Sequence, residues 1–359
     1  MEEPRHPFVE FVIDRKTGQV RQAGAELAVG KTVVEFRERA ERSLFTFAYG
    51  VMGFTQMVED LHAPLAYLMQ DPRYKQINLC IPRSHLKTSL LLALVPHALM
   101  QPPEHNVYFP DGIGEESGFH GSNTRVLWAG ETAEAAEKNV DFLRLKFESN
   151  ELLRALWPHK VWENPARQAR KWAKEGFVLP RTNDYPDLTV TAAGVNQAKT
   201  GGHFSLFVID DVATAKASAS RLIMDQTLEW LRQARDLRDN QRDFRLVSAM
   251  TRWAVWDPVP FWEEEEPWDE RRGTGVYQYI RSAIEDGKSI FPSKHPLEAL
   301  LALQKANPVR FSFQYMNNPL DPSIVSFDLT MLRSCEIGDP REIVTKDGIP
   351  VRALRAFYE

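Results

Sequence analysis

Short apolar runs recur along the chain and alternate with stretches of helical periodicity. Five of these runs have the length and composition of buried strands, at 77–81, 126–130, 188–193, 204–209 and 244–250. Runs that are apolar throughout are typical of parallel strands covered on both faces, whereas half-exposed strands alternate apolar and polar residues. Strands that alternate with helices predict an α/β fold, with a mostly parallel sheet flanked by helices on both faces.

The regions on either side of these strands have a different pattern. Residues 1–40 are polar and carry a turn signal at Lys16-Thr17-Gly18, which predicts a hairpin in a peripheral arm. After Pro258 the composition shifts, and we expect three short elements, namely a strand at 277–280 and helices at 296–305 and 308–316.

Composition places the chain among ordinary globular proteins. With 359 residues, 43% of them hydrophobic and 26% charged, it can bury one large core and a smaller subdomain. Its two cysteines, Cys80 and Cys335, cannot form a disulfide framework, which fits a reducing cytoplasm. The apolar runs are too short to cross a membrane and the N-terminus is too charged for a signal peptide, so we expect neither a membrane span nor export.

The formal net charge of −5 argues against a protein that coats DNA through bulk electrostatics. Any contact with DNA would therefore be local. Two basic stretches, 167–174 and 232–242, are candidates for such a contact, and the alternative for both is a solvated helix face.

A Lys-Thr pair stands between the apolar run that ends at Ile81 and an apolar helix signal that runs to Met100. In the order strand, loop, helix, this stretch is typical of a P-loop, because backbone N–H groups at the helix start face the phosphates. Lys87 would reach the β- and γ-phosphates and Thr88 would ligate magnesium. The usual pattern has glycine at positions 81 and 86, where this chain has Ile and Leu, so a solvated lysine at an exposed helix start is the alternative.

A pair of carboxylates, Asp210-Asp211, directly follows the apolar run 204–209. Ligands of open α/β sheets bind beyond the carboxyl ends of the strands, so we expect these acids to face the same crevice as Lys87. In P-loop enzymes the first acid holds magnesium and its neighbour, often Glu, polarises the attacking water. The acids alone could be an ordinary acidic turn, but the two motifs together favour a Mg-ATP site.

The run 244–250 ends in Thr251-Arg252-Trp253. At this position of such sheets a polar side chain commonly contacts the γ-phosphate or its water and couples hydrolysis to movement. Thr251 and Arg252 are therefore candidates, and the alternative is a strand end packed under Trp253.

In their order and spacing these motifs resemble those of a known family, the large terminase subunits of tailed bacteriophages, which package DNA into proheads. Pro82 to Ser89 looks like the family's deviant Walker A motif, in which an arginine lies near the start and glycine is often missing. Gly201 to Phe204, followed by 207–211, is similar to the Walker B strand and its approach. The remaining matches are a helix with Ser220-Arg221 and Glu229-Trp230, a coupling motif at Ser248 to Trp253 with Asp257, and a segment before the nuclease domain at Phe313 to Pro319.

The resemblance implies a P-loop NTPase of the RecA/ASCE-like class with a small lid subdomain. It implies a motor domain that uses ATP and Mg²⁺ and couples hydrolysis to translocation of double-stranded DNA. The expected partners are DNA, the portal protein, the small terminase subunit and further copies of the chain in a ring on the prohead, with a monomer when alone. The expected location is the host cytoplasm, without a membrane.

The resemblance also assigns roles to individual residues. Thr88 and Asp210 would bind the metal, and Asp211, Arg83, Thr251 and Arg252 would be catalytic. The family often binds adenine just upstream of the loop, where the candidates are Phe54, Gln56 and His62. The nucleotide-binding residues are then Gln56 together with Pro82, Arg83, Ser84, His85, Leu86, Lys87, Thr88 and Ser89.

By the same resemblance the chain divides into an arm (1–40), a P-loop ATPase core (41–257), a lid or linker subdomain (258–325) and the start of a nuclease domain (326–359). We expect a truncated chain without nuclease activity. A further departure is Asp211, where the family has a glutamate. Asp211 could act from a shifted backbone, Glu131 could contribute, or hydrolysis could be slow until the motor assembles.

Two other classes of function stay open. A catalytically degenerate P-loop protein, acting as a nucleotide-binding or structural component, would account for the missing glycines and for Asp211. Another P-loop enzyme, such as a helicase or a small-molecule kinase, would need a second RecA-like domain or an acceptor-site motif, and neither is visible in the sequence.

Overall fold

The computed structural model of the chain describes residues 11–13, 20–22, 29–102, 106–108, 121–195, 201–239 and 244–319. At the start of this range β1 (Phe11–Ile13) pairs antiparallel with β2 (Val20–Gln22), which confirms the two strands of the expected hairpin. Its predicted turn, and the predicted nuclease start at 326–359, lie outside the described residues.

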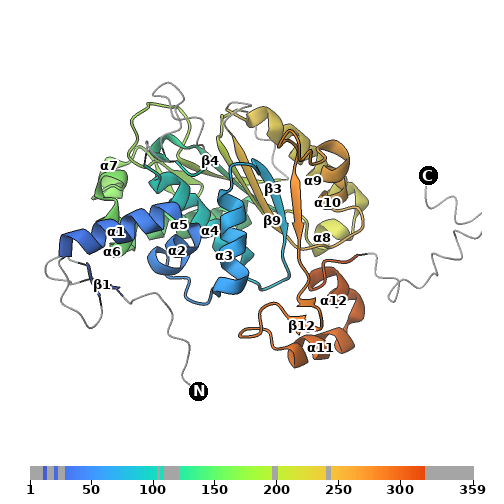
Figure 1. The fold of residues 1–359 in the computed structure, drawn as a ribbon. Helices are drawn as coiled ribbons and strands as arrows, with labels where there is room; N and C mark the ends of the chain where they lie inside the picture. Colours follow the sequence, from blue (N-terminus) through green and yellow to red (C-terminus); the bar gives the residue numbers. More distant parts are fainter. Residues whose placement is uncertain are drawn as a thin grey trace, which may run out of the picture. The chain divides into compact units, whose positions relative to one another are not determined.

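One sheet of eight strands forms the centre of the fold (Figure 1). Its parallel part has the order β10 (Tyr277–Ile280), β3 (Gln76–Cys80), β9 (Arg245–Met250), β8 (Leu206–Asp210), β4 (Val126–Gly130) and β7 (Val190–Gly194). At the β7 edge, β6 (Gly176–Phe177) and β5 (Trp172–Ala173) continue the sheet in antiparallel pairing. The mostly parallel α/β sheet that the apolar runs predict is thereby confirmed.

Helices connect and cover these strands. Those before β3 are α1 (Val29–Arg42), α2 (Leu44–Thr46), the π-helical turn η1 (Phe47–Val51) and α3 (Glu59–Gln70). Those after it are α4 (Lys87–Met100), η2 (Gly121–Asn123), α5 (Ala133–Ser149), α6 (Glu151–Leu156), η3 (Pro158–Lys160), α7 (Pro165–Gln168), α8 (Ala215–Ser218), α9 (Arg221–Gln233), η4 (Ala234–Leu237) and α10 (Pro258–Glu265). No helix in the described part of the chain is long and apolar enough to span a membrane.

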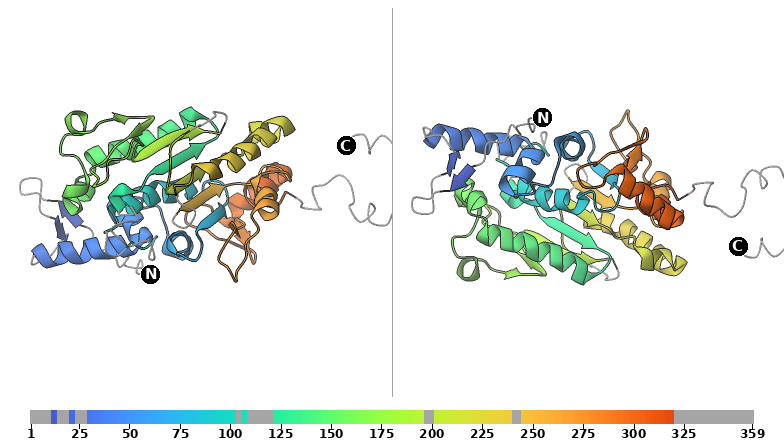
Figure 2. Two further views of the ribbon diagram at one scale, coloured as in Figure 1. Left: turned by 90° about the horizontal axis from the view of Figure 1, so that it is seen from above. Right: turned by 90° about the horizontal axis from the view of Figure 1, so that it is seen from below.

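Alternate residues of each strand point to opposite faces of the sheet, and a different group of helices covers each face (Figure 2). Leu79 and Val208 belong to a core shared with helices α1 to α6. Ile209, which follows Val208 in β8, belongs to the core on the opposite face, and that core contains Trp230 of α9 and Trp262 of α10. Burial on both sides is the physical reason that these strands are largely apolar.

Strand order and register decide where the candidate residues lie. β9 is inserted between β3 and β8, so the strand that leads into the Lys-Thr loop and the strand that ends in acids are separated by one strand. Cys80 pairs with Met250, and Asp210 pairs with Ala249. The three carboxyl ends therefore lie at one edge of the sheet.

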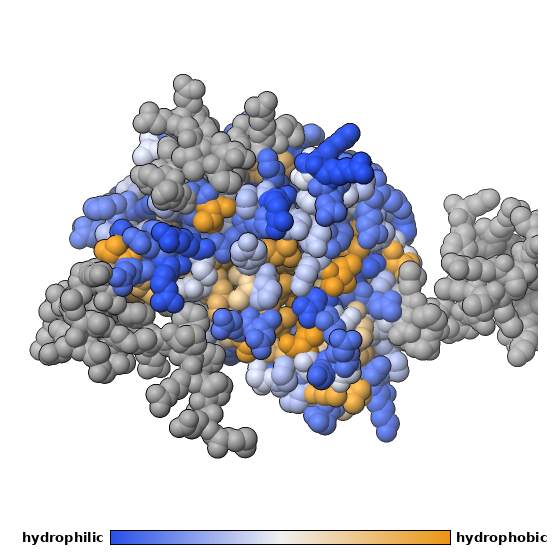
Figure 3. Space-filling view, in the orientation of Figure 1, coloured by the Kyte–Doolittle hydropathy of each residue, from blue (hydrophilic) through white to orange (hydrophobic). Residues whose placement is uncertain are grey.

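A small lobe, which we define as residues 281–319, follows β10. It contains the hairpin β11 (Ile284–Glu285) and β12 (Lys288–Ser289) and the helices α11 (Leu297–Ala306) and α12 (Pro308–Gln314). Ala283, Leu300 and Phe311 form its own buried cluster. Apolar surface is visible over this lobe in Figure 3, and its exposed large apolar side chains are Leu301, Leu303 and Val309.

The range 258–325, assigned to a lid from the sequence, contains both sheet and lobe. β10 pairs in parallel with β3 and is the edge strand of the main sheet. Only the chain beyond it packs as the small lobe. The division into arm, core, lid and nuclease start stays a prediction.

Candidate nucleotide site

The loop between β3 and α4 passes through two left-handed residues, Ser84 with φ of 65° and Leu86 with φ of 60°. A non-glycine residue in this region costs roughly 1–2 kcal/mol. Leu86 stands where the P-loop pattern has glycine, so the backbone keeps a conformation that glycine favours without having the glycine. At the other expected glycine position, Ile81 is buried and its N–H donates to the Met250 carbonyl at 3.2 Å, which continues the pairing of β3 with β9.

Lys87 is the first residue of α4, and its side chain is only 8% exposed. Its Nζ lies 2.8 Å from Asp211 Oδ2, and the Asp211 side chain is 39% exposed. The two motifs that the sequence placed in one crevice are thus in direct contact. A buried ammonium needs a partner, and here the partner is the residue predicted to activate water.

Asp210 has partners on both carboxylate oxygens. Thr88 Oγ1 donates to Oδ1 at 3.0 Å, and Asn139 Nδ2 of α5 donates to Oδ2 at 3.2 Å. Burial, followed by the charge of Asp211, raises the pKa of Asp210, and Lys87 opposes this shift. A buried carboxylate whose charge is disfavoured in this way is stabilised when a cation binds beside it.

The donor atoms at this point fit Mg²⁺. The Thr88 hydroxyl and the Asp210 carboxylate are hard oxygen donors in contact with one another. Mg²⁺ characteristically takes one or two protein oxygens and completes its shell with water and phosphate oxygens. Thr88 and Asp210 are therefore the residues that would hold it.

Asp211 itself has an unusual backbone, with φ of 46°. Its N–H donates to the Ala249 carbonyl at 3.0 Å, and its Oδ1 accepts from the N–H of Thr251 at 3.3 Å. The turn thus directs the shorter Asp side chain between α4 and the end of β9. The alternative base, Glu131, follows β4, and its Oε1 accepts from the Thr214 hydroxyl.

Thr251 and Arg252 were predicted together as candidates for contact with the γ-phosphate. In the structure they contact different residues. Thr251 is buried and meets Asp211 through its N–H. Arg252 Nε lies 2.7 Å from Asp257 Oδ2, and the Asp257 side chain is 0% exposed. In this arrangement the Arg252 guanidinium pairs with Asp257. The backbone of Arg252 follows Thr251 directly and lies next to the site.

Arg83 and His85 of the loop both contact the small lobe. The exposed Arg83 donates from its N–H to the Gln314 carbonyl at 2.9 Å and from Nη1 to Gln314 Oε1 at 3.3 Å. His85 is buried, and its ring stacks on that of His295 with 4.7 Å between centroids and 15° between planes. Burial lowers the pKa of His85 to about 4, so this stack involves a neutral His85 at neutral pH.

The adenine candidates lie in different surroundings. Gln56 is exposed, whereas Phe54 is half-buried and stacks on Phe142 with 6.3 Å between centroids. His62 is buried, and its Nε2 lies 3.3 Å from the carbonyl oxygen of His85 in the loop. Of the three, only His62 contacts the loop directly, and an adenine contact for Gln56 stays a prediction.

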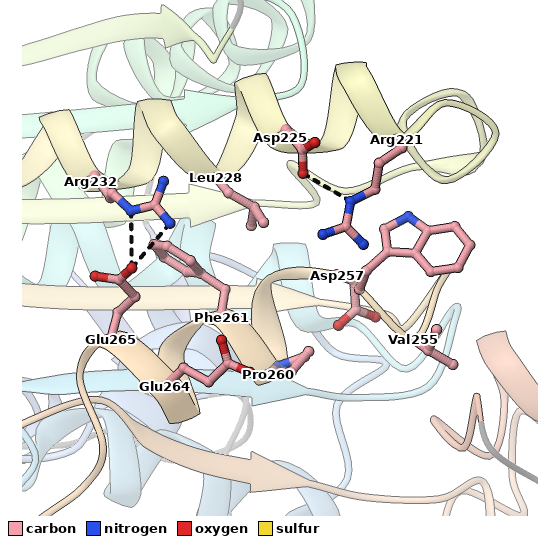
Figure 4. Close-up of a pocket in the computed structure, with 11 residues that line it drawn as sticks. Arg221, Asp225, Leu228, Arg232, Val255, Asp257, Pro260, Phe261, Glu264 and Glu265 are labelled. Atoms are coloured by element: carbon pink, nitrogen blue, oxygen red, sulfur yellow. Dashed lines mark hydrogen bonds and ion pairs between the residues drawn. The ribbon is translucent and has the colours of Figure 1, made fainter. Parts of the chain in front are cut away.

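A groove of about 380 Å³ lies beside the site, between α9 and α10 (Figure 4). One of its walls is the segment 255–257, which follows Arg252. Its arginines are paired, Arg221 with Asp225 and Arg232 with Glu265. Because neither the loop residues nor Asp210 and Asp211 line this groove, it is distinct from the nucleotide site.

Comparisons with known proteins give weak similarities. No family model matches the chain, and no curated protein matches it. Among solved structures, the chain is similar to the ATPase domain of the large terminase of Thermus phage P74-26, with 12% identity, a TM-score of 0.37, and coverage of 67% of this chain and 87% of that one. It is also similar to the large terminase of bacteriophage HK97, with 12% identity, a TM-score of 0.43, and coverage of 83% of this chain and about half (51%) of that one. Similarity at this level carries no argument about what the chain does.

Three polar residues at the site were not predicted from the sequence. Asn139 reaches Asp210 from the surface of α5, and a single polar residue on an amphipathic helix gives no signal. Gln314 and Asn317 lie in the segment 313–319, which carries part of the family resemblance, but their roles could not be assigned without tertiary contacts.

Proposed function

We propose that this chain is the ATP-hydrolysing motor domain of a viral large terminase, coupling hydrolysis of Mg-ATP to translocation of double-stranded DNA into a prohead. The observation that carries the proposal is the cluster of two contacts, Lys87 with Asp211 and Thr88 with Asp210, at the carboxyl ends of β3 and β8. Phosphoryl transfer depends mainly on positioning and on charge stabilisation, and these are the groups it requires.

Each residue then has a distinct role. Lys87 and the exposed Arg83 would neutralise phosphate oxygens. For this, Lys87 would break its ion pair with Asp211. Asp211, released from Lys87, would orient or deprotonate the attacking water. Thr88 and Asp210 would hold Mg²⁺, which when bound neutralises charge on the β- and γ-phosphates. Thr251 would sense the state of Asp211 through its N–H, and Arg252 would pass that state along the backbone.

The biological setting follows from the same proposal. In the host cytoplasm, copies of the chain would form a ring on the prohead and act with the portal protein and the small terminase subunit. A ring motor completes its sites between subunits, so specific ATPase activity would rise with protein concentration.

The test is steady-state ATPase activity against concentration for the 359-residue chain and for Lys87→Ala. The variant should lose at least about 10²-fold in turnover while it stays folded. Lys305→Ala, which removes an exposed lysine outside the site, is the matched control and should retain full activity. Turnover that is unchanged in Lys87→Ala would remove the P-loop assignment.

A degenerate, nucleotide-binding protein is the second candidate, favoured by the strained Leu86 and by Asp211 in place of glutamate. It predicts binding without turnover. Mg-ATP at about 100 times its dissociation constant would then add about 2.7 kcal/mol to the free energy of unfolding, with no phosphate released at any concentration.

A further inference from the structure

Asn317, which follows α12, joins the ends of three strands with one side chain. It is buried, with 4% exposure. Its Nδ2 donates to the carbonyl of Cys80 at 3.0 Å and to that of Arg281 at 2.8 Å, and its Oδ1 accepts from the N–H of Arg252 at 3.1 Å. These three backbone groups lie at or just beyond the carboxyl ends of β3, β10 and β9.

The chemistry of this residue suits a junction. Both amide hydrogens and one oxygen lone pair of Asn317 are used, and a buried amide that loses such partners pays a desolvation penalty. Its φ is 50°, a left-handed conformation that asparagine tolerates better than most residues. The backbone and the side chain therefore favour asparagine for separate reasons.

Asn317 closes a circuit of contacts that begins in the nucleotide loop. Lys87 pairs with Asp211, and Asp211 accepts from the N–H of Thr251. The next residue, Arg252, donates to Asn317, and Asn317 donates to Cys80 at the base of the same loop. Every step is a direct contact of 2.8–3.3 Å.

The residues just before Asn317 extend this circuit into the small lobe. The Met316 carbonyl accepts from the Ser282 hydroxyl at 2.8 Å, and the Tyr315 carbonyl accepts from the Ala283 N–H at 2.7 Å. Gln314, the last residue of α12, holds Arg83 of the loop. The segment 314–317 is thus bound both to the site and to the start of the lobe at 281–283.

We infer that Asn317 is a positioning residue that transmits the nucleotide state from the end of β9 to α12 and the small lobe. This inference rests on the proposed function. When Lys87 moves from Asp211 to the phosphates, Asp211 loses the ion pair that holds it to α4. Its contact with the N–H of Thr251 can then change. The end of β9 can then shift only together with Asn317, because the Arg252 N–H is bound to its side chain.

The test uses Asn317→Gly in the 359-residue chain, because glycine keeps the left-handed backbone and removes only the side-chain contacts. Hydrogen exchange of the α12 amides is compared between a non-hydrolysable ATP analogue and ADP, each with Mg²⁺. The unchanged chain should show at least about a threefold difference in exchange rate between the two states, and the variant should show none. Affinity for the analogue should stay within about threefold, and kcat should fall by at least about tenfold with little change in KM.

Two further variants separate transmission from simple loss of structure. Asn307→Gly removes another side-chain contact of α12, the hydrogen bond that the Arg310 N–H donates to Asn307 Oδ1, and should leave the difference in exchange intact. Asn317→Ala removes the same three side-chain contacts as Asn317→Gly without the backbone freedom of glycine, so it should also abolish the difference, which covers the case in which Asn317→Gly does not fold.

The outcomes distinguish this inference from the function on which it rests. An exchange difference that persists in Asn317→Gly or in Asn317→Ala would overturn the inference alone. Failure of the unchanged chain to bind Mg-ATP would overturn the proposed function and the inference with it.

Discussion

Asp211 departs from the P-loop pattern, in which glutamate is common at this position, and it also has an unusual backbone conformation. Its side chain is one methylene shorter than the glutamate expected there. The left-handed φ of 46° turns the carboxylate between Lys87 and the N–H of Thr251. Whether Asp211 or Glu131 acts as the base stays a prediction.

Replacing Asp211 by Asn should therefore block turnover but keep ATP binding. The amide cannot accept a proton from water, and the loss should be at least about 10²-fold, or about 3 kcal/mol of barrier. Glu131→Gln is the companion variant and should keep most of the activity. Single-turnover hydrolysis with both proteins decides between them, since the reverse result would make Glu131 the base.

Asp210 gives a prediction about pH. Its pKa is raised above the usual value of 3.8, so the folded chain binds the proton more tightly than the unfolded chain does. Without nucleotide or metal, this carboxyl must lower the free energy of unfolding progressively as the pH rises above about 4. Asp210→Asn should then be more stable than the unchanged chain at pH 7.5, by about 1 kcal/mol or more, and the gain should shrink at pH 4.5. Urea unfolding at the two pH values measures this, and a gain independent of pH would contradict it.

At the scale of elements, α9 and α10 show why a basic stretch need not bind DNA. Arg232 lies 3.0 Å from Glu265, and Arg235 Nε lies 2.6 Å from Glu266 Oε1. The acidic run at the end of α10 therefore neutralises arginines that are spaced along α9 and η4. The sequence contains both stretches but gives no sign that they meet.

The segment that links β9 to α10 depends on Asp257. This buried carboxylate accepts from Arg252 Nε, from the N–H of Trp253 and from the N–H of Val259 at the start of α10. Asp257→Ala would leave Arg252 without its partner and α10 without its cap, so it should lower the free energy of unfolding by about 3–5 kcal/mol. Asp257→Asn keeps an acceptor for the cap and should cost less. Chemical denaturation of both variants provides the measurement. An Asp257→Asn variant as stable as the unchanged chain would argue against the ion pair, and equal stabilities of the two variants would argue against the cap.

For the whole molecule, net charge and local charge give different expectations. The chain carries −5, and the arginines of α9 and η4 named above are engaged with glutamates. Within the described residues, Arg167 and Lys171 are the exposed cations that remain of the other basic stretch, because Lys174 pairs with Glu137 and Arg170 donates to the Pro186 carbonyl. A weak, salt-sensitive grip on DNA is compatible with this distribution.

If DNA contacts this surface, Arg167→Gln with Lys171→Gln should weaken binding of a double-stranded oligonucleotide equally for all sequences. The slope of log affinity against log salt should fall in magnitude by roughly 2, since each phosphate contact contributes about 0.9. Arg271→Gln, at an exposed arginine beside the acidic run, is the control. An unchanged slope would place the DNA contact elsewhere.

The sequence by itself determined the fold class, the positions of the inner strands of the sheet, the helix that ends at Met100 and the two helices after residue 296. Parallel strands covered on both faces are mostly apolar on both faces, so 77–81, 126–130, 204–209 and 244–250 were recognisable. The sequence also predicted that Lys87 and the two acids lie in one crevice, because the carboxyl ends of parallel strands lie at the same edge of a sheet.

Only the tertiary structure decided how these groups pair. Strand order and positive φ angles decide that Lys87 pairs with Asp211 and not with Asp210. They also decide that the Arg252 guanidinium pairs with Asp257, and that Asn139 and Asn317 reach the site. Polar contacts between residues far apart in the chain leave no periodic trace, since they require single residues at single positions. Apolar burial repeats along every element, and for that reason it can be read from the sequence.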